Sequence, residues 1–186
     1  GIPGAFLSML GISSLNEIVN QQGYTRPDTI LNLLRDSIIN TLSKNSENHI
    51  VQDGMNISIC VLDLKNSKLE YAGAYNPFYI IRNQSIIKIE ADRMPIGLHV
   101  VDKPFTLHHI QLEPKDRVYL FTDGYSDQIG GEENKKLKRN GFKDLLISIQ
   151  KKPILKHHIL LETYFYKWKR NFEQTDDVTV IGFEVE

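Results

Sequence analysis

The spacing of apolar positions divides the chain into a helical first part and a strand-rich remainder. From Ala5 to Val19, apolar residues recur every three or four positions. The same spacing returns from Thr29 to Leu42, directly after an Arg-Pro-Asp sequence that suits the start of a helix. Both segments are therefore predicted to be helices, and the polar stretch 45–53 between them and the strands is predicted to be a loop.

Beyond position 54 the period changes from three or four residues to two, which is typical of half-buried strands. Short alternating runs are separated by polar turn signals such as Lys65-Asn66-Ser67-Lys68 and Asn83-Gln84-Ser85. The pattern predicts two hairpins, formed by Ile57–Leu62 with Leu69–Gly73 and by Phe78–Arg82 with Ile86–Ile89. Four short strands in succession imply an antiparallel sheet.

The rest of the chain mixes further strands with helices. The sequence predicts strands at Phe105–Leu112, Val118–Phe121 and Val178–Phe183, and helices at Phe142–Gln150 and Lys156–Arg170. No repeat, linker or low-complexity segment interrupts the order. Residues 1–186 are therefore predicted to form a single α+β domain.

Composition and charge narrow the function classes. The 22 Lys and Arg residues nearly balance the 23 Asp and Glu residues, so the net charge is -1 and the pI is about 6.7. A chain with so little net charge has no global field to attract nucleic acid, which we therefore exclude as a partner. The single Cys60 can form no internal disulfide, and no apolar run is long enough to cross a membrane. A cytoplasmic location is expected.

Acidic residues at two predicted strand ends are the strongest candidates for chemistry. Asp123 follows the apolar strand Val118–Phe121, and Asp176 and Asp177 precede the last strand. Rigid strand ends can hold carboxylates together, and Mg²⁺, Mn²⁺ and Ca²⁺ prefer oxygen ligands. Since neighbouring side chains in a strand face opposite ways, only one of the last two should reach a shared site. The alternative is that all three are turn and cap residues.

Other reactive residue types give weaker signals. The pairs His108-His109 and His157-His158 are spaced so that neither pair can easily chelate one ion, and we expect them to be structural or surface residues. Cys60 lies in an apolar strand, where an inert buried thiol is expected. The basic run Lys135–Arg139 is predicted to be a solvated loop, with a docking surface for a phosphorylated protein as the alternative.

Five segments of the chain match the motifs of one known family in the same order. They are Gly1-Ile-Pro-Gly4-Ala-Phe-Leu-Ser-Met-Leu10, Tyr71-Ala-Gly73-Ala-Tyr-Asn76-Pro77, Arg93-Met-Pro-Ile-Gly97, Phe121-Thr-Asp123-Gly124-Tyr-Ser-Asp127-Gln128 and Asp176-Asp177-Val-Thr179. Through these segments essentially the whole chain resembles the SpoIIE-type serine/threonine phosphatases of the metal-dependent type 2C (PPM) superfamily.

The resemblance implies an α-β-β-α sandwich of two antiparallel sheets flanked by helices, with two manganese or magnesium ions at one edge. It implies a phosphatase in which a metal-activated water attacks phosphoserine or phosphothreonine directly. By motif position, Asp123 and Asp176 are expected to be the catalytic metal ligands, and Asp177 a further metal-site residue in a supporting role. The positions expected to support the site are Gly1, Gly4, Asn76, Gly97 and Gly124.

The chain also departs from the family pattern. An acidic Asp-x-x-Gly-His-Gly motif and an earlier acidic strand are expected before Gly1, so we expect an N-terminal truncation that removes the first strands of the sandwich. This chain alone should then have little or no activity, and its exposed sheet edges leave open a homodimer.

The resemblance further implies a regulatory setting. The expected substrate is a phosphorylated signalling protein, with an anti-sigma-factor antagonist as one candidate. An upstream sensor domain would signal through the first two helices, and the parent protein could be membrane-tethered. Two alternatives stay open: a non-catalytic relative that binds a signalling partner, and an unrelated α+β structural domain.

Overall fold

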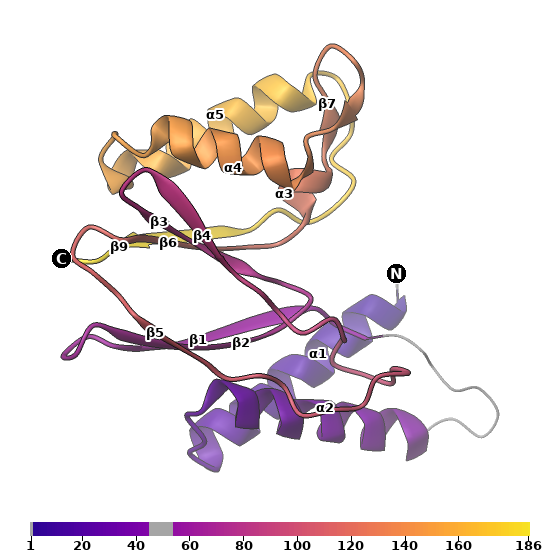
Figure 1. The fold of residues 1–186 in the computed structure, drawn as a ribbon. Helices are drawn as coiled ribbons and strands as arrows, with labels where there is room; N and C mark the ends of the chain where they lie inside the picture. Colours follow the sequence, from indigo (N-terminus) through magenta and orange to yellow (C-terminus); the bar gives the residue numbers. More distant parts are fainter. Residues whose placement is uncertain (1, 45–53) are drawn as a thin grey trace. The chain divides into compact units, whose positions relative to one another are not determined.

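The computed structural model describes residues 2–44 and 54–186, and these residues form two compact units. Unit 1 comprises residues 1–77 and 90–112, and unit 2 comprises residues 78–89 and 113–186. The predicted polar loop at 45–53 lies outside the described residues, as does Gly1. Each unit has its own sheet, helices and apolar core (Figure 1).

Unit 1 begins with the two predicted helices. Helix α1 spans Ile2–Asn16 and continues as the π-helical turn η1 (Glu17–Gln21), and α2 spans Pro27–Lys44. Proline suits the first position of a helix, and Asp28 in the first turn interacts favourably with the helix dipole. The pattern therefore located both helices correctly and placed the start of each two or three residues late.

The sheet of unit 1 has three antiparallel strands in the order β1-β2-β5. They are β1 (Ile57–Asp63), β2 (Lys68–Ala74) and β5 (His108–Gln111). Strand β5 is shorter than predicted, because the main-chain N–H groups of Phe105 and Thr106 donate to the side chains of Asn32 and Asp92. The apolar face of α2 packs with β2 in the core.

The sheet of unit 2 has four antiparallel strands in the order β4-β3-β6-β9. They are β3 (Phe78–Arg82), β4 (Ser85–Ile89), β6 (Arg117–Phe121) and β9 (Val180–Glu184). The two predicted hairpins are thus present but belong to different sheets, and the prediction of one sheet from four successive strands was wrong. The reason is non-local: β3 pairs on its second side with β6, about forty residues further along, and not with β2.

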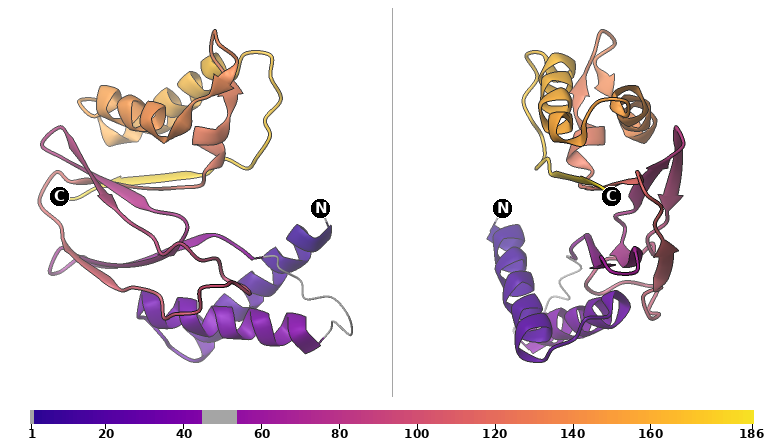
Figure 2. Two further views of the ribbon diagram at one scale, coloured as in Figure 1. Left: turned by 45° about the vertical axis from the view of Figure 1, so that its right-hand side comes forward. Right: turned by 90° about the vertical axis from the view of Figure 1, so that its left-hand side faces the viewer.

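Helices cover one face of this second sheet. Helix α4 (Lys138–Ile149) and helix α5 (His157–Lys169), which follows the short 3₁₀ turn η2 (Ile154–Lys156), lie on the same face in both views of Figure 2. Three small elements were not predicted: helix α3 (Gly124–Asp127) and the two strands of a hairpin, β7 (Ile129–Gly130) and β8 (Lys135–Lys136).

Among the described helices, none is both long and apolar enough to cross a membrane.

Aromatic rings form the centre of the core in unit 2. The Phe142 side chain of α4 is fully buried, with its ring centroid 5.0 Å from that of Phe121 and 4.8 Å from that of Tyr125. Tyr79 packs on Phe121 at 4.6 Å. These rings connect the helices to β3, β6 and α3, so packing at Phe142 supports the end of β6.

A buried histidine links α5 to the sheet. His157 is only 3% exposed. Its Nδ1 lies 2.7 Å from the Tyr119 hydroxyl and its Nε2 lies 3.0 Å from the Lys152 carbonyl oxygen. This confirms a structural role for His157. Burial lowers its pKa below the ordinary value of 6.5, with the nearby Arg117 guanidinium acting in the same direction.

We expect the stability of the protein to fall as the pH drops below about 6.5, in part because of His157. Below that pH the His157 imidazole binds a proton more readily in the unfolded chain than in the folded protein. Protonation therefore stabilises the unfolded state and lowers the free energy of unfolding. Urea midpoints measured between pH 5 and 8 should decrease towards pH 5 in the wild type and decrease less in His157→Gln. Equal pH dependence in the two proteins would contradict this assignment.

Candidate metal centre

The first candidate carboxylate stands where β6 passes into α3. Asp123 is the N-cap residue of α3, and its main-chain oxygen accepts hydrogen bonds from the Asp127 N–H and the Ser126 hydroxyl, both at 2.9 Å. Its side chain is half-buried and has no hydrogen-bond or ion-pair partner within the described part of the chain. A half-buried carboxylate without a protein partner is available to bind a cation.

The second acidic segment lies beside the first because β6 and β9 are antiparallel. The Thr122 N–H donates to the Thr179 carbonyl oxygen at 3.0 Å, which extends the ladder beyond the last paired strand residues. The Thr122 hydroxyl donates to the Asp177 carbonyl oxygen at 2.9 Å and accepts from the Thr179 N–H at 3.0 Å. Thr122 therefore joins the residues next to Asp123 to those next to Asp176.

Glycine is required at the point of closest approach. A Cβ atom on Gly124 would lie 2.4 Å from the main-chain oxygen of Asp177, closer than real Cβ contacts allow. Because Gly124 has no side chain, its main chain can approach the main chain of Asp177 closely. The part of Gly124 in a metal site stays a prediction.

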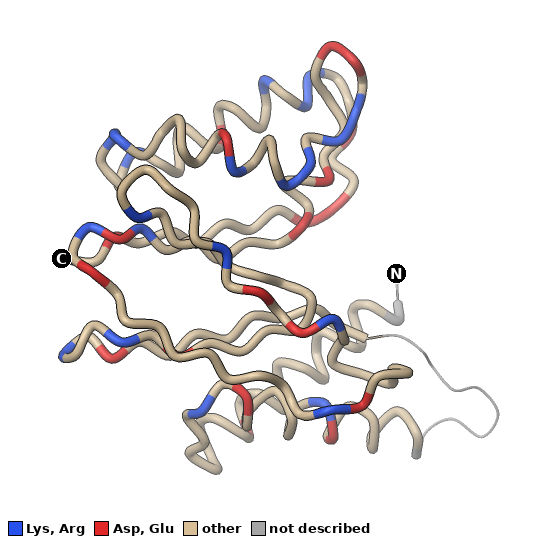
Figure 3. The backbone as a smooth tube through the Cα atoms, in the orientation of Figure 1, with Lys and Arg blue, Asp and Glu red and all other residues tan. Residues whose placement is uncertain are grey.

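The junction between residues 122–124 and residues 176–179 is surrounded mostly by acidic side chains. In Figure 3 acidic positions mark both the end of β6 and the segment that leads into β9. Asp176 and Asp177 are exposed, and the Asp176 carboxylate accepts the Asp177 N–H at 2.7 Å. The counter-charge is Lys136 of β8, whose ammonium lies 2.7 Å from the Asp127 carboxylate. The hydrogen bond that the Lys136 ammonium donates to the Asp127 carboxylate raises the Lys136 pKa, and the charge of Asp123 adds to this effect.

The donor atoms are of the type that a hard divalent cation prefers, but they are few. Carboxylate oxygens of Asp123 and Asp176 are suitable ligands for Mn²⁺ or Mg²⁺. Within residues 2–44 and 54–186, however, no group of three or more His, Cys, Asp or Glu side chains is arranged to hold a metal ion. The structure therefore brings together the two predicted acidic segments, and their part in an oxygen-ligand site stays a prediction.

The remaining predicted site residues lie in unit 1. Gly4 is in the first turns of α1, where an added Cβ would meet no atom within 4 Å. The main-chain oxygen of Asn76 accepts hydrogen bonds from Tyr71 and Ser58, both at 2.6 Å. Gly97 follows Ile96, whose main chain pairs with Met55. The structure thus gives these residues local roles and leaves their part in the site a prediction, and Gly1 lies outside the described residues.

Sequence reasoning missed two residues at the junction. Thr122 belongs to the quoted Thr-Asp-Gly motif, but nothing in the motif shows that its hydroxyl bridges to Asp177 and Thr179. Lys136 was considered only as part of a basic loop, whereas it pairs with Asp127, one helical turn from Asp123. Both roles depend on contacts between segments distant in sequence.

Comparison with known proteins identifies the family to which this chain belongs. The family model described as "Stage II sporulation protein E (SpoIIE)" matches residues 1–186. The chain therefore belongs to the SpoIIE family of protein serine/threonine phosphatases. No curated protein matches the chain in sequence.

Solved structures show the same fold at low sequence identity. The SiaA-PP2C domain of Pseudomonas aeruginosa is 24% identical, with a TM-score of 0.87 over 100% of this chain and 72% of that one. A manganese-soaked SpoIIE phosphatase domain from Bacillus subtilis is 16% identical, with a TM-score of 0.59 over 95% and 73%. A structure of the RsbU and RsbW domains of Rv1364c from Mycobacterium tuberculosis is 19% identical, with a TM-score of 0.70 over 99% and 48%.

Proposed function

We propose that this chain is a metal-dependent phosphatase domain that hydrolyses phosphoserine or phosphothreonine in a signalling protein. The observation that carries the proposal is the junction at Thr122 and Gly124, which holds Asp123 beside the Asp176-Asp177 segment. Membership of a phosphatase family supports the reaction class. The half-buried Asp123 carboxylate, which has no hydrogen-bond or ion-pair partner among residues 2–44 and 54–186, supports the metal.

Each residue of the junction has a distinct task in this proposal. Asp123 and Asp176 hold the cation, and Asp177 supports them through its main-chain contacts with Thr122 and Gly124. The bound metal ion supplies a water of lowered pKa and stabilises charge on the phosphoryl oxygens. The hydrogen bonds of Thr122 keep the two segments in register, so that the carboxylates are preorganised before a cation binds.

A non-catalytic module that binds a signalling partner is the second candidate. The observation that favours it is the shortage of ligands, since the described residues contain no cluster of three potential metal-binding side chains. Ligand number and charge set the affinity for a hard dication, so this chain by itself should bind Mn²⁺ weakly and have little or no activity.

A manganese titration by calorimetry, combined with a phosphoserine-peptide assay in excess Mn²⁺, tests the proposal. We expect weak binding to the wild-type chain and at least tenfold weaker binding to Asp123→Asn, because the variant loses one charged ligand. Asp144→Asn is the matched control, since Asp144 is exposed on α4 away from the junction.

The outcomes separate the two candidates. Turnover that Asp123→Asn abolishes and Asp144→Asn preserves would establish the phosphatase. Metal binding that depends on Asp123 without turnover, in this chain and in any longer form of the protein, would favour the binding module. Equal Mn²⁺ affinity of the wild type and Asp123→Asn would contradict the metal site itself.

The proposed partner is a phosphorylated signalling protein, with an anti-sigma-factor antagonist as a candidate. The support is by analogy: the Mycobacterium tuberculosis structure, 48% of which this chain covers, contains an RsbU domain together with an RsbW domain. An upstream sensor domain that signals through α1 and α2 is proposed on the same footing, since one SpoIIE structure includes a fragment of a regulatory domain.

A further inference from the structure

The hairpin of β7 and β8 is held on the C-terminal end of α5. The Trp168 indole donates to the Gln128 carbonyl oxygen at 3.0 Å, and the Gly131 N–H donates to the Trp168 carbonyl oxygen at 2.8 Å. A Cβ atom on Gly130 would overlap with that same oxygen, and one on Gly131 would lie 2.8 Å from the indole ring. Only glycine allows so close an approach, so the hairpin has a fixed place on α5.

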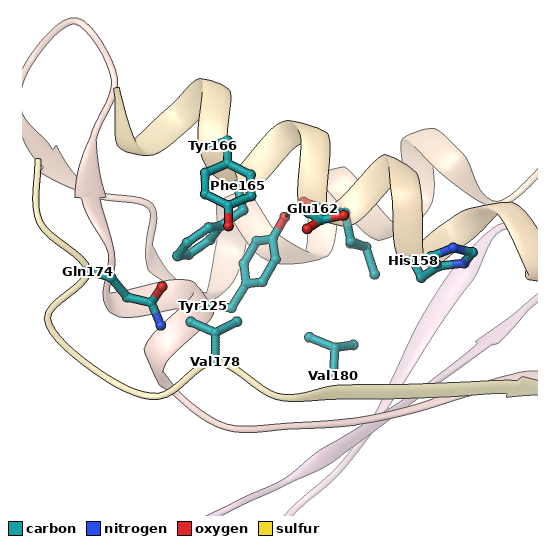
Figure 4. Close-up of a pocket in the computed structure, with 9 residues that line it drawn as sticks. Tyr125, His158, Glu162, Phe165, Tyr166, Gln174, Val178 and Val180 are labelled. Atoms are coloured by element: carbon teal, nitrogen blue, oxygen red, sulfur yellow. Dashed lines mark hydrogen bonds between the residues drawn. The ribbon is translucent and has the colours of Figure 1, made fainter. Parts of the chain in front are cut away.

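The same helix also holds α3, the helix that follows Asp123. The Tyr125 side chain points from α3 towards α5 in Figure 4, and its ring centroid lies 5.2 Å from that of Phe165. The Tyr125 hydroxyl donates to the Leu161 carbonyl oxygen at 2.7 Å. Because Tyr125 is buried, this contact belongs to the core of unit 2. Helix α5 therefore holds α3 and the hairpin at a fixed distance from each other.

Lys136 of β8 connects the hairpin to α3. Its ammonium lies 2.7 Å from the carboxylate of Asp127, which follows Asp123 by about one helical turn. The negative charge of Asp123 also acts on Lys136. The neighbouring Lys135 is paired elsewhere, with Glu133 at 2.7 Å. The fold thus keeps one particular positive charge, that of Lys136, beside the carboxylate that we propose as a metal ligand.

A positive charge in this place opposes the binding of a dication. The repulsion between two ions is proportional to the product of their charges, so Lys136 repels Mn²⁺ twice as strongly as it would a monovalent cation. The ion pair with Lys136 also occupies the Asp127 carboxylate, a potential oxygen donor. Since both side chains of the pair are about half exposed, these effects should be moderate and sensitive to salt.

We propose that Lys136 is an internal counter-ion of the metal centre, which balances the charges of Asp123 and Asp127 and thereby sets the affinity of the chain for a divalent cation. This inference rests on the proposed function, because it takes Asp123 as a metal ligand. Lys136 acts through its charge and does not bind the metal itself. A dication competes with the Lys136 ammonium for the same carboxylates.

Calorimetric Mn²⁺ titrations of the intact chain at low and high salt test this role. At low salt, Lys136→Met should bind Mn²⁺ about threefold to tenfold more tightly than the wild type, because the opposing charge is gone. Lys136→Arg keeps the charge and should bind as the wild type does. Lys135→Met is the matched control on the same hairpin and should change the affinity clearly less. In about 1 M potassium chloride, where the Debye length is about 3 Å, the gain in Lys136→Met should shrink.

Urea unfolding separates this role from a structural one. An exposed ion pair contributes little to stability, so the urea midpoint of Lys136→Met should stay close to that of the wild type. If Lys136 served only to hold the hairpin on α3, its replacement would loosen the site and leave Mn²⁺ binding unchanged or weaker.

The outcomes also separate this inference from the metal site on which it rests. Unchanged or weaker Mn²⁺ binding in Lys136→Met, combined with a loss in Asp123→Asn, overturns the counter-ion role and leaves the metal site in place. Equal gains in Lys136→Met and Lys135→Met, or a gain that persists in full at high salt, also overturn it. Equal Mn²⁺ affinity of the wild type and Asp123→Asn would contradict the metal site and this inference together.

Discussion

Replacing Phe142 with alanine is expected to destabilise the protein by about 3–5 kcal/mol, the largest loss that a single side chain in unit 2 should cause. The Phe142 ring is fully buried against Tyr79, Phe121 and Tyr125, so its removal leaves a cavity between α4 and the sheet. Since those rings flank the end of β6, the Asp123 junction should also loosen. Urea unfolding followed by circular dichroism measures the first effect.

Phe172→Ala is the matched control for this experiment. Phe172 is 36% exposed and lies after α5, so the same chemical change should cost clearly less than at Phe142. Equal losses at the two positions would mean that the aromatic core does not hold unit 2 together. Hydrogen exchange of the β6 amides in Phe142→Ala would show whether the loss reaches the junction.

Local periodicity was sufficient to predict most helices and strands of this fold. Helices α1, α2, α4 and α5 each bury an apolar stripe, and the four residues Val118–Phe121 are apolar because β6 lies inside its sheet. The missed elements are those too short to show a period. Helix α3 has four residues, and strands β7 and β8 have two each.

Strand pairing was harder to predict than strand position. The hairpins β1-β2 and β3-β4 follow from their turn signals. Their separation into two sheets depends on β5, β6 and β9, which pair with them or with one another across long intervals of sequence. An alternating pattern gives the face of a strand but not its neighbour, so the single-sheet prediction failed at this step.

The candidate site was predictable in its residue types and not in its geometry. Asp123 and the Asp176-Asp177 pair were found because acidic residues stand at the ends of apolar strands. The hydrogen bonds through Thr122 depend on the register between β6 and β9, which the sequence does not contain. Asp123 is the N-cap residue of α3 by position, but its carboxylate makes no capping hydrogen bond, so the structure does not give this side chain the capping role of the turn-and-cap alternative.

Gly124→Ala is expected to separate the two acidic segments and to destabilise the protein by about 1–3 kcal/mol. The added methyl group would lie 2.4 Å from the Asp177 oxygen, and both contacting atoms are held by main chain, so neither can rotate away. Relief requires β6 and the segment before β9 to move apart, which strains the Thr122 hydrogen bonds. Manganese affinity should therefore fall together with stability, although no carboxylate has been removed.

Gly4→Ala provides the matched control, because an added Cβ at Gly4 meets no atom within 4 Å. In a helix this change should be neutral or stabilise by up to about 1 kcal/mol. Comparison of urea midpoints for the two variants then isolates the effect of the contact on stability from that of a methyl group. The calorimetric Mn²⁺ titration of Gly124→Ala is compared with that of the wild type, because Gly4 is itself a predicted site residue. Unchanged stability and metal affinity in Gly124→Ala would show that the approach of Gly124 to Asp177 does not hold the two segments together. A loss of stability with unchanged metal affinity would show that metal binding does not require Asp123 and Asp176 to be held side by side.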